Sequence, residues 1–95
     1  MLGRPTKYNE ARVGTICALL RLGCSRKTAA AGAGIDFQTF LNWRRRYSTF
    51  STALTRAEAE ASIAMTLCVT RAAADGNVEA ALFWLSRRRP EEWGP

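Results

Sequence analysis

The stretch RKTAAAGAGIDFQTFLNWRR, from Arg26 to Arg45, decides the fold that we expect for this chain. Ala30 is its fifth residue, at the point where two helices crossing at about 90–120° leave room only for a small side chain. Gly34 is its ninth residue and can end the first helix in a left-handed conformation without a steric penalty. Asp36 is a suitable N-cap for the second helix. The spacing therefore predicts a helix-turn-helix.

Residues before and within this stretch predict a three-helix domain. A first helix is expected to start after Asn9 and to reach Leu22, because apolar residues recur at helical spacing between them. Ser25 can cap a second helix, which should end near Ala33, and a third helix is expected over residues 37–47. An ordinary Ala-rich helical hairpin without a nucleic-acid role is the alternative to a DNA-binding domain.

The third helix has two faces of different chemistry. Phe40 and Trp43 belong to an apolar stripe that should face the first two helices. Gln38, Asn42 and Arg45 follow one another at intervals of four and three on another side of the helix. Glutamine and asparagine offer the donor and acceptor that match adenine, and arginine can contact guanine or phosphate. We therefore expect this polar face to enter a DNA groove.

Charge is distributed unevenly along the chain, which carries a formal net charge of +6. Residues 1–47 contain nine basic and two acidic residues, or +7, whereas residues 48–95 contain five basic and six acidic residues, or −1. A basic half of this kind is typical of a module that binds phosphate. A basic surface that serves only solubility does not explain the asymmetry. The basic residues that we expect to contact DNA are Arg4, Lys7, Arg26, Lys27, Arg44, Arg45 and Arg46.

The second half of the chain predicts a helical hairpin. No proline or glycine interrupts residues 48–75, so we expect one long helix there, which at 1.5 Å per residue would span about 42 Å. Gly76 and Asn77 form a two-residue turn, and Asn77 can cap a shorter helix over residues 78–88. This shorter helix is expected to fold back antiparallel on the long one.

Small and apolar residues of this hairpin predict self-association. Those of the long helix alternate by four and three, as in a coiled-coil seam, and the shorter helix adds two aromatic residues outside its own apolar stripe. The chain is too short to cover apolar surface on both sides of the hairpin. An intramolecular bundle that folds back over the first three helices is the alternative. The predicted oligomerisation residues are Phe50, Leu54, Ala57, Ala61, Ala64, Cys68, Phe83 and Trp84.

Composition argues against several classes of function. The chain has three cysteines, no CxxC pair and no histidine, so we expect no metal site. It has no glycine-rich phosphate loop of the type GxxxxGK[ST], and its acidic residues are scattered, so we expect no catalytic residues, no cofactor and no enzymatic activity. No apolar run approaches the roughly 20 residues needed to cross a bilayer, which predicts a soluble protein without a membrane partner.

Four segments, taken in order, resemble a known family. They are GRPTKY at residues 3–8, LNW at residues 41–43, the Ala-rich helix that follows Phe50, and WLSRRRPEEWG at residues 84–94. In this order and spacing the chain resembles the small subunits of phage terminases, which recognise viral DNA for packaging. The resemblance implies an all-α protein with a helix-turn-helix DNA-binding domain at residues 1–47 and an oligomerisation hairpin at residues 48–95. The residues that match the recognition helix of the family are Gln38, Thr39, Asn42, Arg44, Arg45 and Arg46.

The resemblance also implies partners and a location. The chain would bind double-stranded phage DNA in the cytoplasm of the bacterial host, assemble into a cyclic homo-oligomer, and deliver DNA to a separate large subunit that holds the ATPase and the nuclease. Many such proteins continue past the hairpin, whereas this sequence stops at Pro95, which leaves residues 87–93 as the candidate contact with the large subunit. A dimeric helix-turn-helix transcriptional regulator is the competing function, and it should be a two-fold dimer on a palindromic site. A purely structural assembly protein is a third.

Overall fold

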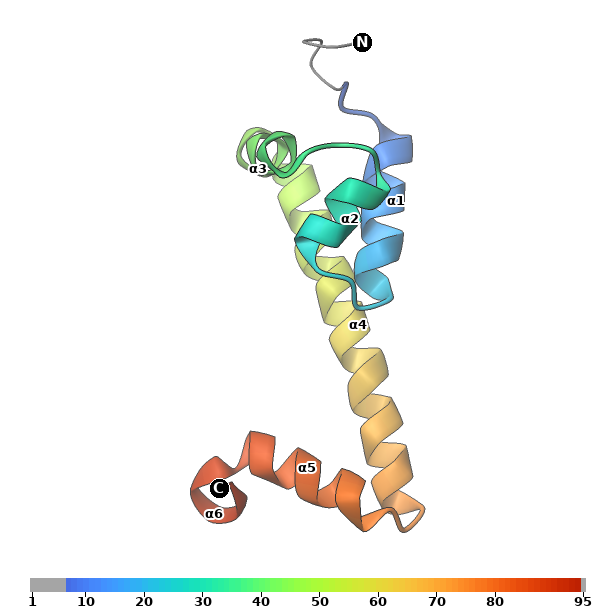
Figure 1. Ribbon diagram of the computed structural model, residues 1–95, viewed down its shortest axis with the longest axis vertical. Coiled ribbons are helices and arrows are strands. Elements are labelled where there is room, and N and C mark those ends of the chain that lie inside the picture. The colour runs from blue at the N-terminus through green and yellow to red at the C-terminus, as the bar shows by residue number, and fades with distance from the viewer. Residues whose placement is uncertain (1–6, 95) are drawn as a thin grey trace. The chain divides into compact units, whose positions relative to one another are not determined.

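The computed structural model describes residues 7–94, which form an all-helical protein with no strand in that range (Figure 1). The six helices are α1 (Glu10–Arg21), α2 (Arg26–Gly32), α3 (Phe37–Arg46), α4 (Ser48–Ala74), α5 (Val78–Arg88) and α6 (Pro90–Trp93). The first five agree closely with the predicted ranges. α6 was not predicted, because a single turn of helix is too short to show a hydrophobic period.

Contacts divide the chain into two compact units, with the boundary between Ala61 and Ser62. We call residues 7–61 the head and residues 62–94 the tail. The single helix α4 contributes its first half to the head and its second half to the tail. The predicted boundary after Tyr47 thus lies earlier than the division that the contacts make.

Side-chain caps begin the first three helices. Asn9, Ser25 and Asp36 each accept a hydrogen bond from the backbone N–H three residues further along the chain, which satisfies one of the free donors of the first turn. Gly34 follows α2 with a φ of 78°, in the left-handed region that glycine enters without a steric penalty. These local features confirm the caps and the glycine turn predicted from the sequence.

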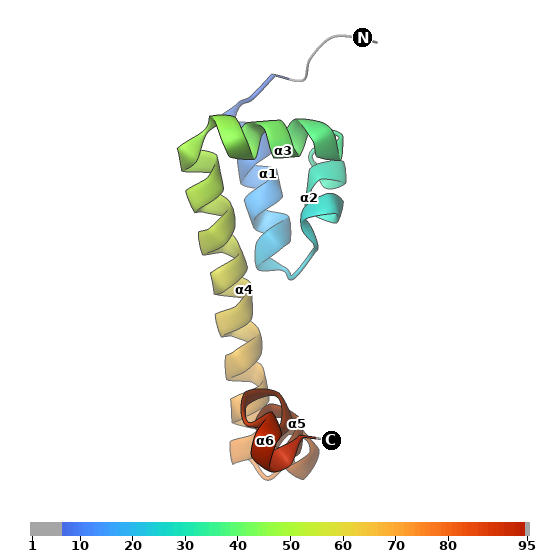
Figure 2. The same cartoon turned by 90° about the vertical axis from the view of Figure 1, so that its left-hand side faces the viewer.

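The head is built around one apolar core. α3 runs crosswise to α1 and to the first half of α4 (Figure 2), and the rings of Phe40 and Phe50 meet at 5.3 Å between centroids. Ala30 is 1% exposed, as expected where two helices approach closely. The core residues are Ile16, Cys17, Leu20, Ala29, Ala30, Ile35, Phe40, Trp43, Phe50, Leu54 and Ala57.

The first half of α4 belongs to this core, which corrects the predicted seam between subunits. Phe50, Leu54 and Ala57 are 0% exposed and pack with residues of α1, α2 and α3, and Ala61 is 8% exposed. A repeat of four and three marks an apolar face, but it does not tell whether the same chain or a second copy covers that face. In this chain the head itself covers it.

In the tail, α5 leaves the turn at Gly76 and Asn77 at a steep angle to the second half of α4 (Figures 1 and 2). The predicted antiparallel hairpin is therefore wrong in the direction of its second helix, although the turn and the cap at Asn77 are where the sequence places them. Seven large apolar side chains of the tail are between 47% and 67% exposed: Ile63, Met65, Leu67, Val78, Leu82, Phe83 and Trp93. Among the described helices, none is long and apolar enough to span a bilayer.

Candidate nucleic-acid interface

α3 buries one face in the head and exposes the other. Phe40 is fully buried and Trp43 is 6% exposed, as the apolar stripe predicts. At the start of the helix, the side chain and the backbone N–H of Thr39 donate hydrogen bonds to Asp36, and these bonds lower the pKa of the Asp36 carboxyl. The cap and the buried rings fix the orientation of α3, so the residues on its opposite face project into solvent.

Gln38, Asn42 and Arg45 form a hydrogen-bonded row on the exposed face of α3. Gln38 Nε2 donates to Asn42 Oδ1 at 3.2 Å, and Arg45 Nη2 donates to the same oxygen at 2.7 Å. These bonds use neither the Asn42 amide N–H groups nor the Gln38 carbonyl. All three side chains are exposed. The structure therefore brings the three predicted base-reading residues together.

Three consecutive arginines, Arg44, Arg45 and Arg46, end α3 and are exposed. Within residues 7–94, none of them lies within ion-pair distance of a carboxylate. The Arg46 guanidinium lies 5.5 Å from the centroid of the Tyr47 ring. Cations at the C-terminal end of a helix are also favoured by the helix dipole. The cluster can thus contact a phosphate without first breaking an ion pair.

The remaining predicted DNA contacts differ in their surroundings. Lys27 is exposed on α2, with its ammonium 5.5 Å from the centroid of the Phe37 ring at the start of α3. Lys7 is exposed just before α1. Arg4 lies outside the described residues. Thr39 is half-buried and its side chain serves the Asp36 cap, so the structure gives it a role within the helix.

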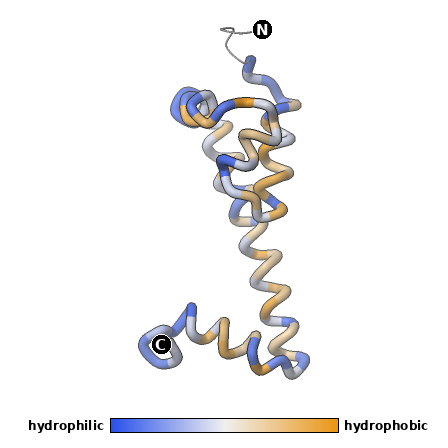
Figure 3. Tube along the Cα trace, viewed as in Figure 1, coloured by the Kyte–Doolittle hydropathy of each residue, from blue (hydrophilic) through white to orange (hydrophobic). Residues whose placement is uncertain are grey.

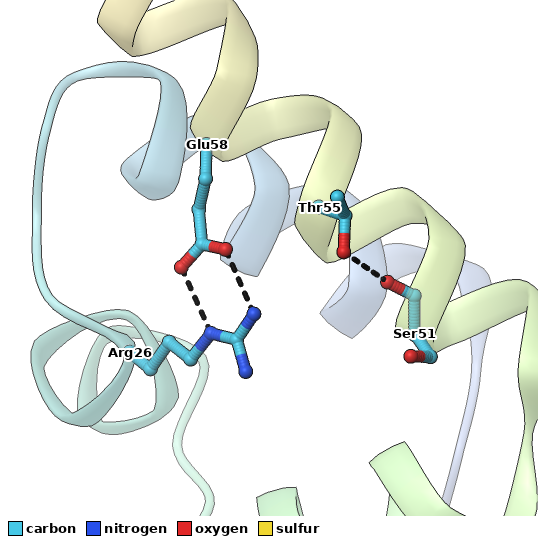
Figure 4. A network of polar contacts seen from close by, with 4 residues as sticks. All are labelled: Arg26, Ser51, Thr55 and Glu58. Atoms are coloured by element: carbon cyan, nitrogen blue, oxygen red, sulfur yellow. Dashed lines mark hydrogen bonds and ion pairs between the residues drawn. The ribbon is translucent and has the colours of Figure 1, made fainter.

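Arg26 has a partner within the head and is not a free cation. Its Nε and Nη2 atoms each donate to one carboxylate oxygen of Glu58 at 2.8 Å, which joins α2 to α4 (Figure 4). The hydrogen bond from Arg26 lowers the pKa of Glu58, and the same bond raises the pKa of Arg26. We therefore correct the prediction that Arg26 contacts DNA, because a phosphate would first have to displace Glu58.

Two residues that the sequence analysis did not single out support α3. The Tyr8 ring stacks on Tyr47 with centroids 3.9 Å apart and meets Trp43 edge-on at 5.0 Å. Arg12 Nη1 donates to the carbonyl of Ala33 at 2.9 Å, in the turn that leads to α3. An apolar residue just before an N-cap is a known signal for packing on the first turns of the helix that follows, here α1, so it does not predict the contacts of Tyr8 with Trp43 and Tyr47. Arg12 carried no signal.

The predicted oligomerisation residues that follow Ala61 lie in the tail. Ala64 and Cys68 are exposed on α4, Phe83 is exposed on α5, and Trp84 is half-buried beside it. In the part of the chain that the structure describes, no group of three or more Asp, Glu, Cys or His side chains could hold a metal ion. Comparison of the chain with protein-family models, with curated proteins and with solved structures found no match.

Proposed function

We propose that the chain binds double-stranded DNA through a helix-turn-helix formed by α2 and α3, with α3 as the recognition helix. The observation that carries this proposal is the exposed row of Gln38, Asn42 and Arg45 on a helix whose other face is buried. An α-helix fits the major groove of B-DNA, and amide and guanidinium groups read base edges there. The hydrogen bonds within the row can be exchanged for bonds to bases.

Phosphate contacts would come from cations on either side of this row. The exposed cations of the head that lack a carboxylate partner within residues 7–94 are Lys7, Lys27, Arg44, Arg45 and Arg46. Each phosphate neutralised releases counterions, so four or five contacts correspond to a slope of log affinity against log salt of about −4 to −5. These phosphate contacts position the head on DNA without reading its sequence.

The biological role that we propose is that of a phage terminase small subunit, which recognises viral DNA for packaging. The resemblance along the chain supports this role, and so do the exposed apolar side chains of the tail, because patches of this kind mark interaction surfaces. In this role the tail joins several copies into a ring, each copy contributes one DNA-binding head, and the ring works with a separate ATPase and nuclease subunit.

Affinity of the full chain for a short duplex, measured by fluorescence anisotropy at several salt concentrations, tests DNA binding. Arg44→Ala combined with Arg46→Ala should weaken binding to all sequences and reduce the slope by about two units. Arg71→Ala removes an exposed arginine of the tail and should change neither quantity. A wild-type affinity that does not depend on salt contradicts the proposal.

The mass of the protein in solution distinguishes the packaging role from that of a transcriptional regulator. A closed oligomer of more than two copies supports the packaging function. A two-fold dimer that prefers a palindromic site with half-sites about one helical turn apart supports the transcriptional regulator instead.

A further inference from the structure

The tail contains an apolar groove between the second half of α4 and α5. Met65 and Val69 line it from α4, and Phe83 and Trp84 line it from α5. Its volume is about 300 Å³. Met65 is 58% exposed and Phe83 is 54% exposed, so apolar walls of the groove face solvent. Exposed apolar surface of this kind is typical of a site that binds a partner.

Positive charge borders this groove. Arg87 and Arg88 also line it. The Arg87 guanidinium lies 5.0 Å from the centroid of the Phe83 ring, and the Arg88 guanidinium lies 5.7 Å from that of Trp84. Neither arginine forms an ion pair within residues 7–94. The groove therefore suits an aromatic side chain accompanied by carboxylates.

The chain itself carries a segment with this chemistry. α6 contains Glu91, Glu92 and Trp93, and the tryptophan is 51% exposed. Figure 3 shows α6 as hydrophilic at the end of the more apolar α5. Neither glutamate forms an ion pair within the described residues, and Trp93 is not among the side chains that line the groove. Each copy thus presents both a basic, apolar groove and an acidic, aromatic segment.

We propose that α6 of one copy docks into the groove of a second copy, with Trp93 between the apolar walls and Glu91 and Glu92 against Arg87 and Arg88. Aromatic residues that enter a pocket are the usual anchors of protein interfaces, and the opposite charges select the partner and its orientation. This inference rests on the self-assembly included in the proposed function, and it names the surfaces that meet.

The docking contact is heterologous, because the groove and α6 are different surfaces of the same tail. A heterologous contact leaves one free groove and one free α6 on every added copy, and it stops only when a ring closes. A helix of 4 residues makes a small contact compared with a standard protein interface. In a closed ring the last contact forms within one assembly and every copy is held by two contacts, which adds stability that a single contact lacks.

A mixing experiment with two charge-reversed full-length variants tests this contact between copies. Arg87→Glu with Arg88→Glu makes both groove and α6 acidic, whereas Glu91→Arg with Glu92→Arg makes both basic. Each variant alone should fail to assemble, because the groove of one copy repels the α6 of a second, identical copy. An equimolar mixture should assemble again, as measured by light scattering, because each groove then meets an α6 of opposite charge. The two variants alternate in such an assembly, so a ring with an even number of copies should regain the wild-type mass.

Single variants separate docking from folding. Trp93→Ala should weaken assembly about tenfold or more, Trp93→Phe should weaken it less, and Glu79→Arg, an exposed charge reversal on α5 outside the groove, should leave it unchanged. Circular dichroism checks that all variants keep their helix content. The proposal is overturned if the wild type is monomeric, if the charge-reversed variants assemble alone, or if folded variants do not assemble when mixed. Salt-dependent DNA binding of the wild type is measured separately, so a failure of docking and a failure of DNA binding are distinguished.

Discussion

The ring of Tyr8 stacks on the ring of Tyr47, with their centroids 3.9 Å apart and their planes 18° apart. Tyr8 lies before α1, and Tyr47 lies between α3 and α4. The stack therefore ties the residues just before α1 to the C-terminal end of α3. Arg46 also lies over the Tyr47 ring. Tyr47 therefore contacts both Tyr8, which follows Lys7, and one arginine of the cluster that ends α3.

Removal of this stack should lower both the stability of the head and its affinity for DNA. Tyr8→Ala deletes three aromatic contacts, to Trp43, Tyr47 and Phe50, and should lower the free energy of unfolding by about 1–3 kcal/mol, since the ring is only half-buried. Tyr8→Phe keeps the ring and should stay close to wild type. Urea denaturation measures the stability. DNA affinity should fall for Tyr8→Ala under conditions where the variant is folded, because Lys7 is no longer held near α3; equal affinity of both variants argues against this positioning role.

The ion pair between Arg26 and Glu58 should make the stability of the head sensitive to acid. The pKa of Glu58 is lowered below its usual value of 4.5, chiefly by the hydrogen bond from Arg26. The pair therefore stabilises the folded state above that value, and this contribution is lost as the pH falls through the lowered pKa. Glu58→Gln should be less stable than wild type by about 1 kcal/mol or less at pH 7, because the pair is partly exposed to solvent.

The difference between Glu58→Gln and wild type should shrink from pH 7 towards pH 3, because the wild-type carboxylate takes up a proton as the pH falls through its lowered pKa. Urea denaturation at both pH values measures this. A difference that is the same at both would show that the ionised pair does not stabilise the head.

Signals in neighbouring residues predict the helices of the head well. Caps such as Asn9 and Asp36 act within three residues of their own position, and Gly34 fixes the turn through its own backbone conformation. The polar row on α3 could also be predicted, because residues four and three apart on one helix share a face wherever the helix lies.

Partners that are distant in sequence could not be predicted. Arg26 and Glu58 are 32 residues apart, and nothing in the charge pattern joins them. Leu54 shows the same limit for apolar residues, since its spacing marks a buried face without naming what buries it. The direction of α5 depends on packing after the turn, and Gly76 and Asn77 determine only where the turn occurs.

Two alanines of α4 distinguish the core of the head from the exposed surface of the tail. Ala57 is 0% exposed in the head core, whereas Ala64 is exposed in the tail. Ala57→Leu should destabilise the head by about 1–3 kcal/mol through overpacking, without changing the oligomer mass of the folded protein. Ala64→Leu should leave the stability of the head unchanged. Denaturation and light scattering on both variants measure these effects. If Ala57→Leu lowers the oligomer mass without lowering the stability of the head, the first half of α4 belongs to the subunit interface after all.

The last prediction separates base reading from phosphate binding. Gln38→Ala with Asn42→Ala removes the amides of the exposed row on α3, and each well-made bidentate base contact discriminates between bases by about 1–3 kcal/mol. The double variant should therefore lose its preference among DNA sites. Its salt slope, mass and helix content should not change, because the arginines of α3 and the tail are intact.

Competition binding between a preferred site, selected from random duplexes with the wild type, and a scrambled site measures this preference. Arg45→Ala is an informative companion variant, because it removes a cation together with a donor to Asn42. It should reduce both the preference and the salt slope. If the Gln38 and Asn42 double variant keeps its preference, α3 does not read bases through these amides. Selectivity would then come from DNA shape and deformability, sensed by several weakly bound heads that act together in one oligomer.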